Sequence, residues 1–335
     1  MKAFVVEKYG KDGLHAAHLP EPTPGPHDVV VRVSAAGINP LDKMVRNGEF
    51  RQLLKYRTPF VLGHDVAGVV TRVGAEVSDF KAGDEVYARP RDLRIGTFAE
   101  RIAIDRADVA LKPARLTMEE AAAVPLVALA AWQALVDLAQ VKPGQKVLVH
   151  AGAGGLGSTV VQLASHLGAY VATTARGEDE KKVRSLGADE VIDYTTTDFT
   201  ESLSGYDVVL DSVGGDNLAK SLTVLRPGGL AISLVGPPDA AFAEQLGRRV
   251  MKPVMALLSR KVRAQAKKLG VRYSFFFMRA DGRQLKTLAA LYDSGALLPV
   301  LDRAFPFDQT PEAMAYVEKG RANGKIVVTM DTSAT

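Results

Sequence analysis

A glycine-rich turn between an apolar strand and an apolar helix constrains the fold of this chain more than any other feature. The strand at 147–150 (VLVH) runs into AGAGGLG, and an apolar helix follows at 158–167. Gly152, Gly154 and Gly157 fill the glycine positions of G-x-G-x-x-G. Such glycines permit a tight turn, the close approach of a pyrophosphate, and close packing of helix on strand. The turn therefore predicts a βαβ unit that binds a dinucleotide.

The backbone at the start of that helix completes the predicted phosphate site. The N–H groups of Gly155 and Leu156 lie in its first turn, where the helix dipole favours an anion. Apolar strands that alternate with helical segments surround the turn, which is typical of a parallel sheet with helices on its faces. These strands are expected at 146–150, 170–174, 190–193, 207–211, 230–235 and 271–276. Six strands suffice for a complete dinucleotide-binding sheet. A long helical segment interrupted by Pro253 is expected at 240–269, and a last strand at 325–330.

The length of the chain and a change in its sequence pattern near residue 120 indicate two domains. Its 335 residues exceed the roughly 250–300 residues of a single core. The first 120 residues or so contain short β-like runs punctuated by glycine and proline, as in a small irregular barrel. We expect one domain at 1–122, completed by 281–335, and a second at 123–280. The fold class is therefore α/β, with a β-barrel domain beside a doubly wound parallel sheet.

Composition excludes several classes of protein. The chain contains no cysteine, so disulfides, thiol nucleophiles and zinc sites with thiolate ligands are excluded. The N-terminal MKAFVVEKYG lacks the apolar core of a signal peptide, and we expect a cytoplasmic protein. The longest apolar run, 121–136, contains Pro125 and Gln133 and is shorter than the ~20 residues of a membrane span. It predicts a buried helix, and we expect no membrane partner.

Positive charge is concentrated in one segment. Residues 248–268 contain eight lysines and arginines and no acidic residue, whereas the whole chain has a net charge of +4, which leaves 4 − 8 = −4 for the remainder. A basic character this local does not indicate a nucleic-acid-binding protein. We interpret the segment as a solvated helix face, with an anionic partner or substrate as the alternative.

The residues after the second strand indicate which dinucleotide binds. NAD sites usually place an acidic residue there, about 20 residues after the glycines, to bind the ribose hydroxyls. Here Thr174 occupies that position and Arg176 follows. A hydroxyl and a guanidinium would bind a 2′-phosphate that a carboxylate would repel. We therefore predict NADP(H), with Arg176 as a solvated loop residue being the alternative interpretation.

Five further motifs carry a resemblance to a known family. In chain order they are GINPLD (37–42), GHDVAGVV (63–70), FKAGDEVYA (80–88), GTFAE (96–100) and VKPGQKVLVHAGAGGLG (141–157). Together they resemble the medium-chain dehydrogenase/reductases over essentially the full length. The chain is most similar to the zinc-independent branch of quinone oxidoreductases and NADPH-dependent ene-reductases (2-alkenal reductases). The resemblance implies a GroES-like domain and a Rossmann domain.

The resemblance also indicates how the metal site of zinc-dependent relatives has changed. His64 matches their histidine ligand and Asp65 replaces the following glutamate, but the two cysteine positions fall on Asn39 and near Leu126. One imidazole does not make a three-ligand catalytic site. We therefore expect no metal, and we expect His64 to be a hydrogen-bonded scaffold residue.

The family implies further cofactor contacts. Tyr194 matches a tyrosine beside the 2′-phosphate; alternatively, it is a half-buried residue after the third strand. Asn39 matches an asparagine near the nicotinamide ribose; alternatively, it is a turn residue before Pro40. Five residues fall where relatives line the nicotinamide pocket: Val213, Leu234, Val235, Phe275 and Phe277. The alternative interpretation is that they are residues of core strands. Asn323 and Lys325 lie on the segment that closes over the cofactor in relatives.

The reaction expected from the resemblance is hydride transfer from NADPH to the β-carbon of an enone or enal. Quinone reduction and cofactor binding without catalysis are the alternatives. The resemblance does not identify the residue that donates a hydrogen bond to the substrate oxygen. Relatives often have a lysine at the position of Met44, and in this chain the lysine, Lys43, lies one position before it. We consider Lys43 and Tyr87 as catalytic candidates. Relatives commonly pair their last Rossmann strands, so we expect a homodimer through 271–276.

Overall fold

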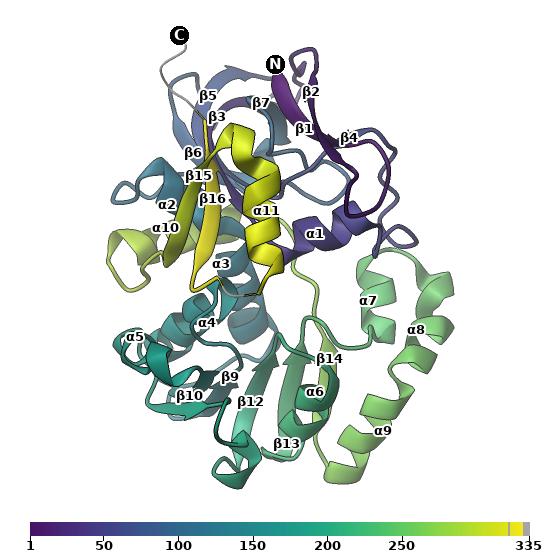
Figure 1. Cartoon of the computed structure of the whole chain (residues 1–335), viewed down its shortest axis with the longest axis vertical. Helices are drawn as coiled ribbons and strands as arrows, with labels where there is room; N and C mark the ends of the chain where they lie inside the picture. Colours follow the sequence, from purple (N-terminus) through teal and green to yellow (C-terminus); the bar gives the residue numbers. More distant parts are fainter. Residues whose placement is uncertain (321, 331–335) are drawn as a thin grey trace. The chain divides into compact units, whose positions relative to one another are not determined.

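The computed structural model describes residues 1–320 and 322–330, which form two compact units (Figure 1). Unit 1 comprises Met1–Leu129 with Arg279–Thr335, and unit 2 comprises Ala130–Met278. The boundaries therefore differ from the predicted 122/123 and 280/281. The first boundary lies later because α2 (Met118–Ala123) packs on the sheet of unit 1, and because the N–H of Leu126, in α3 (Pro125–Trp132), donates to Asp65 at 2.8 Å.

Unit 2 contains the predicted doubly wound sheet. Its strands are β9 (Lys146–Val149), β10 (Tyr170–Ala175), β11 (Glu190–Asp193), β12 (Tyr206–Asp211), β13 (Leu225–Ser233) and β14 (Arg272–Phe275). They are ordered β11-β10-β9-β12-β13-β14 and all neighbours are parallel. The order reverses between β9 and β12, and ligands bind at the carboxyl ends of the strands at such a switch point.

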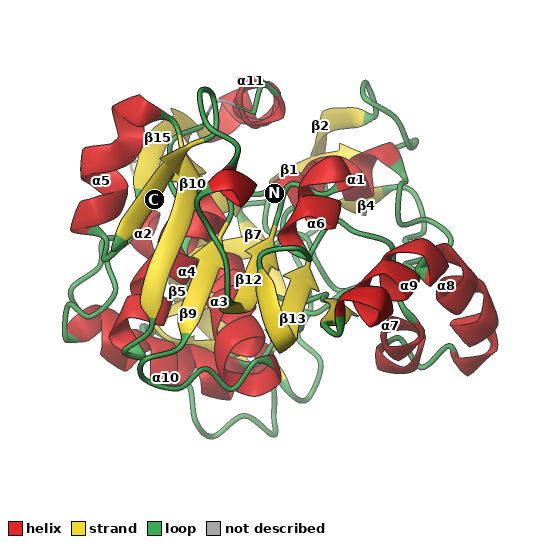
Figure 2. Cartoon of the chain, turned by 90° about the horizontal axis from the view of Figure 1, so that it is seen from below, coloured by secondary structure: helices red, strands yellow, loops and turns green. Residues whose placement is uncertain are grey.

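Helices connect these strands, and three of them form a separate group beside β14 (Figure 2). The unit contains a π-helical turn (Gln133–Leu138), α4 (Gly155–His166), α5 (Glu180–Ser185), α6 (Gly215–Ser221), α7 (Ala240–Gln245), α8 (Lys252–Leu258) and α9 (Arg260–Leu269). The sequence predicted one segment at 240–269 interrupted by Pro253. Instead, Pro253 lies in the first turn of α8, where its missing N–H leaves no helical hydrogen bond unmade.

Unit 1 is built around two sheets. The larger has the order β15-β16-β3-β5-β6-β8, with β7 also paired to β3, and the smaller has the order β2-β1-β4. The strands are β1 (Lys2–Val6), β2 (Leu14–His18), β3 (Asp28–Ile38), β4 (Phe60–Val61), β5 (Asp65–Val73), β6 (Glu85–Ala88), β7 (Arg101–Asp105), β8 (Val109–Leu111), β15 (Leu301–Pro306) and β16 (Lys325–Thr329). Helices α1 (Pro40–Asn47), α10 (Gly282–Asp293) and α11 (Thr310–Glu318) belong to the same unit.

The strand β16 lies inside the larger sheet although it is the last strand of the described chain. It pairs antiparallel with β3 on one side and parallel with β15 on the other. The sequence predicted β16 but did not predict β15. The residues of β15, LDRAFP, do not alternate between apolar and polar side chains, and such alternation is the usual signal of a strand. Among the described residues, no helix combines the length and the apolar character required to cross a bilayer.

Candidate functional site: a dinucleotide turn and a buried polar cluster

The glycine turn after β9 leaves no room for side chains at two positions. A Cβ on Gly152 would lie 2.0 Å from the Thr173 hydroxyl, and a Cβ on Gly157 would lie 2.1 Å from the carbonyl oxygen of Ala151. A Cβ on Gly154 would come only to 3.3 Å of that oxygen. The first and third glycines are therefore required by packing, whereas a methyl group at the second needs only a small shift of the neighbouring oxygen. The left-handed residue of the turn is Ala151, with φ of +56°, rather than a glycine.

The helix α4 begins directly after this turn, with Gly154 as its N-cap. The first N–H groups of a helix have no acceptor within the helix, and those of Gly155 and Leu156 belong to this set. They present positive partial charge at the carboxyl end of β9, where an anionic pyrophosphate is favoured. Both residues therefore lie where the sequence predicted them.

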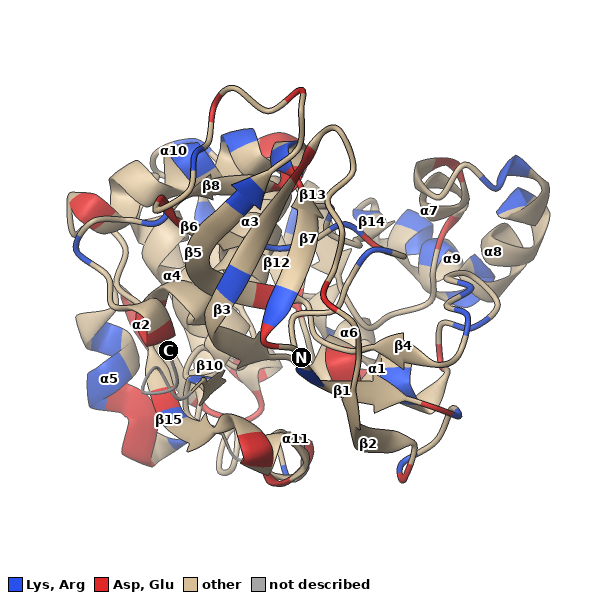
Figure 3. Ribbon diagram, turned by 90° about the horizontal axis from the view of Figure 1, so that it is seen from above, with Lys and Arg blue, Asp and Glu red and all other residues tan. Residues whose placement is uncertain are grey.

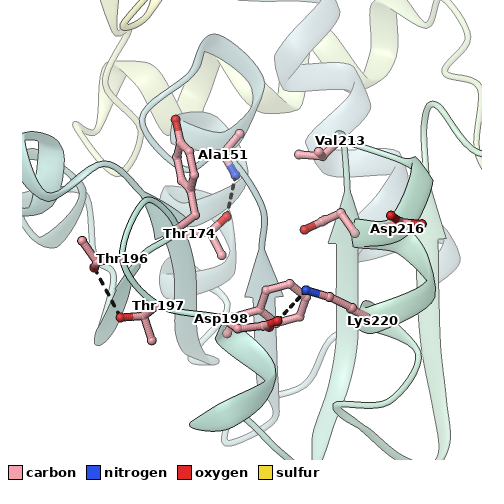
Figure 4. Close-up of a pocket in the computed structure, with 11 residues that line it drawn as sticks. Ala151, Thr174, Thr196, Thr197, Asp198, Val213, Asp216 and Lys220 are labelled. Carbon is pink, nitrogen blue, oxygen red and sulfur yellow. Dashed lines mark hydrogen bonds and ion pairs between the residues drawn. The ribbon is translucent and has the colours of Figure 1, made fainter.

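A cavity of about 640 Å³ opens beside the turn (Figure 4). Its lining comes from the ends of β9, β10, β11 and β12 and from α6. The lining residues are Ala151, Thr174, Tyr194, Thr196, Thr197, Asp198, Phe199, Val213, Asp216, Asn217 and Lys220. All of them belong to unit 2, so this unit by itself forms a pocket at the switch point of its sheet.

The Thr174 hydroxyl forms hydrogen bonds with the glycine turn and the residue before it. Its Oγ1 accepts a hydrogen bond from the N–H of Ala151 at 3.1 Å and lies 3.1 Å from Nδ1 of His150. The Thr174 hydroxyl thus has partners within the protein, and it also lines the cavity; that it contacts a 2′-phosphate stays a prediction. The other ring nitrogen of His150 lies 2.9 Å from the Ser221 hydroxyl. Burial lowers the pKa of His150 to about 4, so the imidazole is neutral at pH 7.

Arg176 and Tyr194 come together at the rim of the cavity. The Arg176 Nε donates to the Tyr194 hydroxyl at 3.1 Å, and Nη1 lies 3.6 Å from Glu178. The bond to Tyr194 raises the pKa of Arg176 above its ordinary value, and the guanidinium faces solvent. The two residues that the sequence singled out independently thus form one cationic, hydrogen-bonding corner beside β10.

Two further parts of this site were not found from the sequence. Asp211, at the end of β12, is fully buried and shapes the next turn by accepting from the N–H groups of Val213 at 3.1 Å and Gly214 at 2.9 Å. Its other oxygen accepts from the Ser233 hydroxyl at 2.7 Å. The letters DSVGG, an acid before two glycines at a strand end, are the signal that could have indicated this turn.

An ion pair forms one wall of the cavity. Lys220 of α6 and Asp198 point toward each other in Figure 4 and form a short hydrogen-bonded pair. Hydrogen bonds from Lys220 and Thr200 lower the pKa of Asp198 to about 2. Because both charges are already paired, this wall contributes shape more than net charge. A pair 22 residues apart has no local sequence pattern that would predict it.

The residues expected around the nicotinamide separate into three groups. Val213 lines the same cavity as Thr174 and Tyr194. Leu234 and Val235 follow β13 and are partly or largely exposed. Phe275 and Phe277 are buried, and their ring centroids lie 4.8 and 5.3 Å from that of Phe242 in α7. The phenylalanines therefore match the alternative interpretation as core residues.

Unit 1 contains a buried polar cluster at the start of α1. Asn39 Nδ2 donates to Asp65 at 2.9 Å, and Lys325 Nζ donates both to Asn39 Oδ1 and, at 3.2 Å, to Asp65. The Leu126 N–H completes the set at 2.8 Å from the other Asp65 oxygen. Burial raises the pKa of the Asp65 carboxyl, and the Lys325 ammonium and Asn39 amide oppose this rise. The side chains of Asn39 and Lys325 are thus committed to each other and to Asp65.

His64 lies beside this cluster and is fully buried. Its Nδ1 lies 2.6 Å from an Asp42 oxygen, and the second Asp42 oxygen accepts from the Asn39 N–H at 2.7 Å. The expected scaffold role fits this geometry, although Nε2 has no partner among the described residues. In the part of the chain that the structure describes, no group of three potential ligands could hold a metal ion. The residues present therefore do not fit the zinc of metal-dependent relatives.

The two catalytic candidates have different surroundings. Lys43 is half-buried on α1, and the described residues include no carboxylate partner for it. Tyr87 is 0% exposed, and its hydroxyl donates to the Leu285 carbonyl of α10 at 2.6 Å. A buried hydroxyl committed to a carbonyl cannot donate to a substrate, so Tyr87 is a packing residue and that candidate is corrected. Asn323 is exposed, and its N–H donates to Asp302 at 2.9 Å.

Known families match both parts of the chain. The alcohol dehydrogenase GroES-like domain matches residues 25–114, and the family described as zinc-binding dehydrogenase matches residues 186–328. The second description names a metal for which this chain lacks the cysteine ligands. The GroES-like fold agrees with the sheets of unit 1.

Relatives match nearly the whole chain. NAD(P)H oxidoreductase RTN4IP1, mitochondrial, of Mus musculus is 34% identical over 98% of this chain and 89% of its own length. The NADPH-dependent alkenal/one oxidoreductase, chloroplastic, of Arabidopsis thaliana is 35% identical over 98% and 79%. The quinone oxidoreductase structure from Coxiella burnetii superposes with a TM-score of 0.86 at 28% identity, covering 99% of both chains. The chain therefore belongs to the medium-chain dehydrogenase/reductase family of oxidoreductases, in its zinc-independent branch.

Proposed function

We propose that this protein is an NADPH-dependent reductase of activated carbon–carbon double bonds, with α,β-unsaturated aldehydes and ketones as substrates. The observation that carries the cofactor assignment is the corner formed by Arg176 and Tyr194 at the end of β10. Thr174 occupies the strand position where NAD sites usually have an acidic residue, and Glu178, 3.6 Å from the guanidinium, lies in the short helical turn that follows. A guanidinium and a phenol suit a 2′-phosphate, and an acidic residue would favour NAD(H). The turn at 151–157 fits the pyrophosphate of the same cofactor.

The substrate class follows from the residues at the former metal positions. The positions of the two cysteines of zinc-dependent relatives fall on Asn39 and near Leu126, and this chain has no cysteine, so polarisation of a substrate oxygen falls to hydrogen-bond donors or cations. Conjugate acceptors suit such donors because the developing charge spreads over an enolate. Bound NADPH supplies the hydride, which adds to the β-carbon. Of our two candidates for the donor, Lys43 remains, and water or a weak acid can protonate the carbon.

A quinone is the second candidate substrate. It accepts a hydride with the same need for an oxygen-directed donor and without a metal. The support for this alternative is the similarity to the quinone oxidoreductase of Coxiella burnetii, whereas the relative from Arabidopsis thaliana supports the enone. A protein that binds NADPH without catalysis is the remaining alternative.

Oxidation of NADPH and NADH with an alkyl enal and with a naphthoquinone separates these functions. We expect rapid, chelator-insensitive loss of NADPH with the enal and much slower loss of NADH. Faster turnover of the naphthoquinone would favour the second candidate. Measurable NADPH binding without turnover of either substrate would contradict both reductase proposals and favour the binding protein.

We also propose a homodimer formed through β14, because this strand is the outer edge of the sheet in unit 2. An edge strand presents unpaired N–H and C=O groups that a second copy can satisfy. Sedimentation equilibrium is expected to give twice the 35.8 kDa of one chain. A species with the mass of a single chain at all concentrations would overturn this proposal.

A further inference from the structure

The connection between β13 and β14 carries an apolar stripe that no described residue covers. Val250, Val254, Leu257 and Leu258 have exposed fractions of 87%, 49%, 67% and 57%. Their spacing of four, three and one residues places them on one face of α8 and the turn before it. The opposite face is turned inward through Met255 and Ser259, which are almost fully buried. The helix is therefore anchored on one side and apolar on its solvent side as well.

A run of unpaired positive charge continues this stripe. In α9 the exposed cations are Arg260, Lys261, Arg263, Lys267 and Lys268, and the described residues place no carboxylate within ion-pair distance of them. Figure 3 shows lysine and arginine in α9, whereas Lys252 is the one cation of α8. We call the solvent-facing side chains of residues 250–268 the α8–α9 surface.

The apolar and cationic parts are adjacent along the chain. Backbone hydrogen bonds join α8 to α9 across Ser259, from its N–H to Met255 at 3.0 Å and from the Arg263 N–H to its carbonyl at 3.0 Å. Within α9, Lys261 and Lys268 are seven positions apart, so they lie on the same face of that helix.

We propose that the α8–α9 surface binds the anionic lipid surface of a membrane, with the stripe of aliphatic side chains inserted among the headgroups and the cations against their phosphates. Membrane-surface helices combine these two features. A second copy of the same surface would bring two cationic runs together, so its charge is complementary to anionic lipid and not to itself. The remainder of the chain has a net charge of −4, which favours approach to such a membrane by this side.

This contact differs from the membrane span that the sequence excluded. The expectation of no membrane partner rested on the absence of a long apolar segment, whereas interfacial binding requires only a short amphipathic one. The inference goes beyond the proposed reductase activity and does not depend on it, because vesicle binding is measured without turnover.

Co-sedimentation of the full chain with vesicles tests the proposal. We expect binding to phosphatidylcholine vesicles that contain phosphatidylglycerol, and little binding to phosphatidylcholine alone. Binding should fall steeply between about 0.1 M and about 1 M salt, as the Debye length shortens from about 10 Å to about 3 Å.

Two double variants test the two features separately. Leu257→Ser with Leu258→Ser removes half of the apolar stripe, and Lys261→Glu with Lys268→Glu reverses two charges. Each should lower the partition coefficient roughly tenfold or more, since one cation near an anionic surface contributes about fivefold. NADPH oxidation without vesicles should stay unchanged, which shows that the variants are folded.

Matched controls change exposed residues elsewhere in the chain. Leu111→Ser with Leu298→Ser, at 56% and 52% exposure, matches the leucine pair, and Lys8→Glu with Lys11→Glu matches the charge reversal. Neither control should alter binding. The proposal is overturned if the wild-type chain does not bind anionic vesicles at low salt, or if the α8–α9 variants bind no more weakly than their controls. It is also overturned if the leucine variant abolishes self-association while vesicles are not bound, because a second copy then covers the surface.

Discussion

The glycine turn of unit 2 and the buried polar cluster of unit 1 are built in opposite ways. The turn consists mainly of small residues and ends in the N–H groups of Gly155 and Leu156, which have no acceptor within the helix, next to an open cavity of about 640 Å³. The cluster consists of Asn39, Asp65 and Lys325, whose polar atoms satisfy each other inside the sheet. The first region is left incomplete for a ligand, whereas the second is largely complete without one.

This difference shows where a binding function can reside. A site that must accept a cofactor needs unsatisfied groups and empty space, and both exist at the turn. Saturated buried charges contribute mainly to structure, because any ligand would have to displace an existing partner. Four experiments test this contrast, and we give them in order of decreasing expected effect.

Replacing Lys325 with methionine should have the largest effect on stability. It leaves the buried Asp65 carboxylate without its cation, and removing one partner of a buried pair typically costs about 3–5 kcal/mol. Thermal unfolding measured at neutral pH should show the loss. The control is Lys81→Met, since Lys81 forms an exposed ion pair with Asp84 that contributes about 1 kcal/mol or less. Equal effects of the two variants would show that the cluster is not a structural unit.

Alanine at two glycines of the turn should separate packing from binding. Gly157→Ala places a methyl group against the Ala151 carbonyl oxygen, and overpacking of this kind costs about 1–3 kcal/mol. Gly154→Ala requires only a small shift of the Ala151 oxygen and has an ordinary φ of −75°, so its melting temperature should change much less than that of Gly157→Ala. Its methyl group would nevertheless lie where we expect the pyrophosphate. NADPH titration should therefore show weaker binding for both variants; unaltered binding by Gly154→Ala would contradict this position for the phosphates.

Arg176→Ala should weaken NADPH and spare NADH. Loss of the guanidinium beside Tyr194 removes a charge-assisted contact to the 2′-phosphate, so KM for NADPH should rise roughly tenfold or more. Arg184→Ala is the matched control, because Arg184 pairs with Glu180 on α5 and does not line the cavity. A parallel rise in KM for both dinucleotides would refute the role of Arg176 in 2′-phosphate recognition.

His150 should give the smallest effect at neutral pH, because its contribution to stability appears only as the pH falls below about 6.5. Its native pKa is about 4, against about 6.5 in an unfolded chain, so only the unfolded state takes up this proton in between. Stability should fall as the pH drops through this window, by at most about 1.4 kcal/mol per unit from this group, with no further loss below about pH 4. Urea unfolding of His150→Gln should show a shallower dependence than the wild-type chain, whereas the exposed control His18→Gln should not. Identical slopes for His150→Gln and wild type would show that His150 does not titrate in this window.

The sequence predicted the turn better than the cluster because of the distances along the chain. Gly152, Gly154 and Gly157 lie within six residues, and their spacing alone indicates their role. Lys325 and Asp65 are 260 residues apart, and no local pattern reveals that they meet. The candidate Tyr87 failed for a related reason: the carbonyl that binds its hydroxyl belongs to Leu285, which is remote in sequence.

Strand β15 and the breaks between α7, α8 and α9 show a second limit. β15 has mostly exposed or half-exposed residues and depends on pairing with β16 for its conformation, so its own letters do not indicate a strand. The sequence predicted an interruption of the helix at Pro253. Proline is also favoured in the first turn of a helix, and Pro253 occupies that position in α8. The breaks between the helices lie at 246–251 and at Ser259. Propensity alone cannot choose between these positions.

The position of β16 in the sheet has a consequence for how the protein is made. Unit 2 is one continuous segment, Ala130–Met278, and all of its strands have been translated well before β16. Unit 1 must wait, because β3 near the start of the chain pairs with a strand that is added only after residue 325. Domains generally fold as units during synthesis. The nucleotide-binding half can therefore form on the ribosome while β3 still has an open edge, and that edge is the segment a nascent chain most needs to keep from other strands.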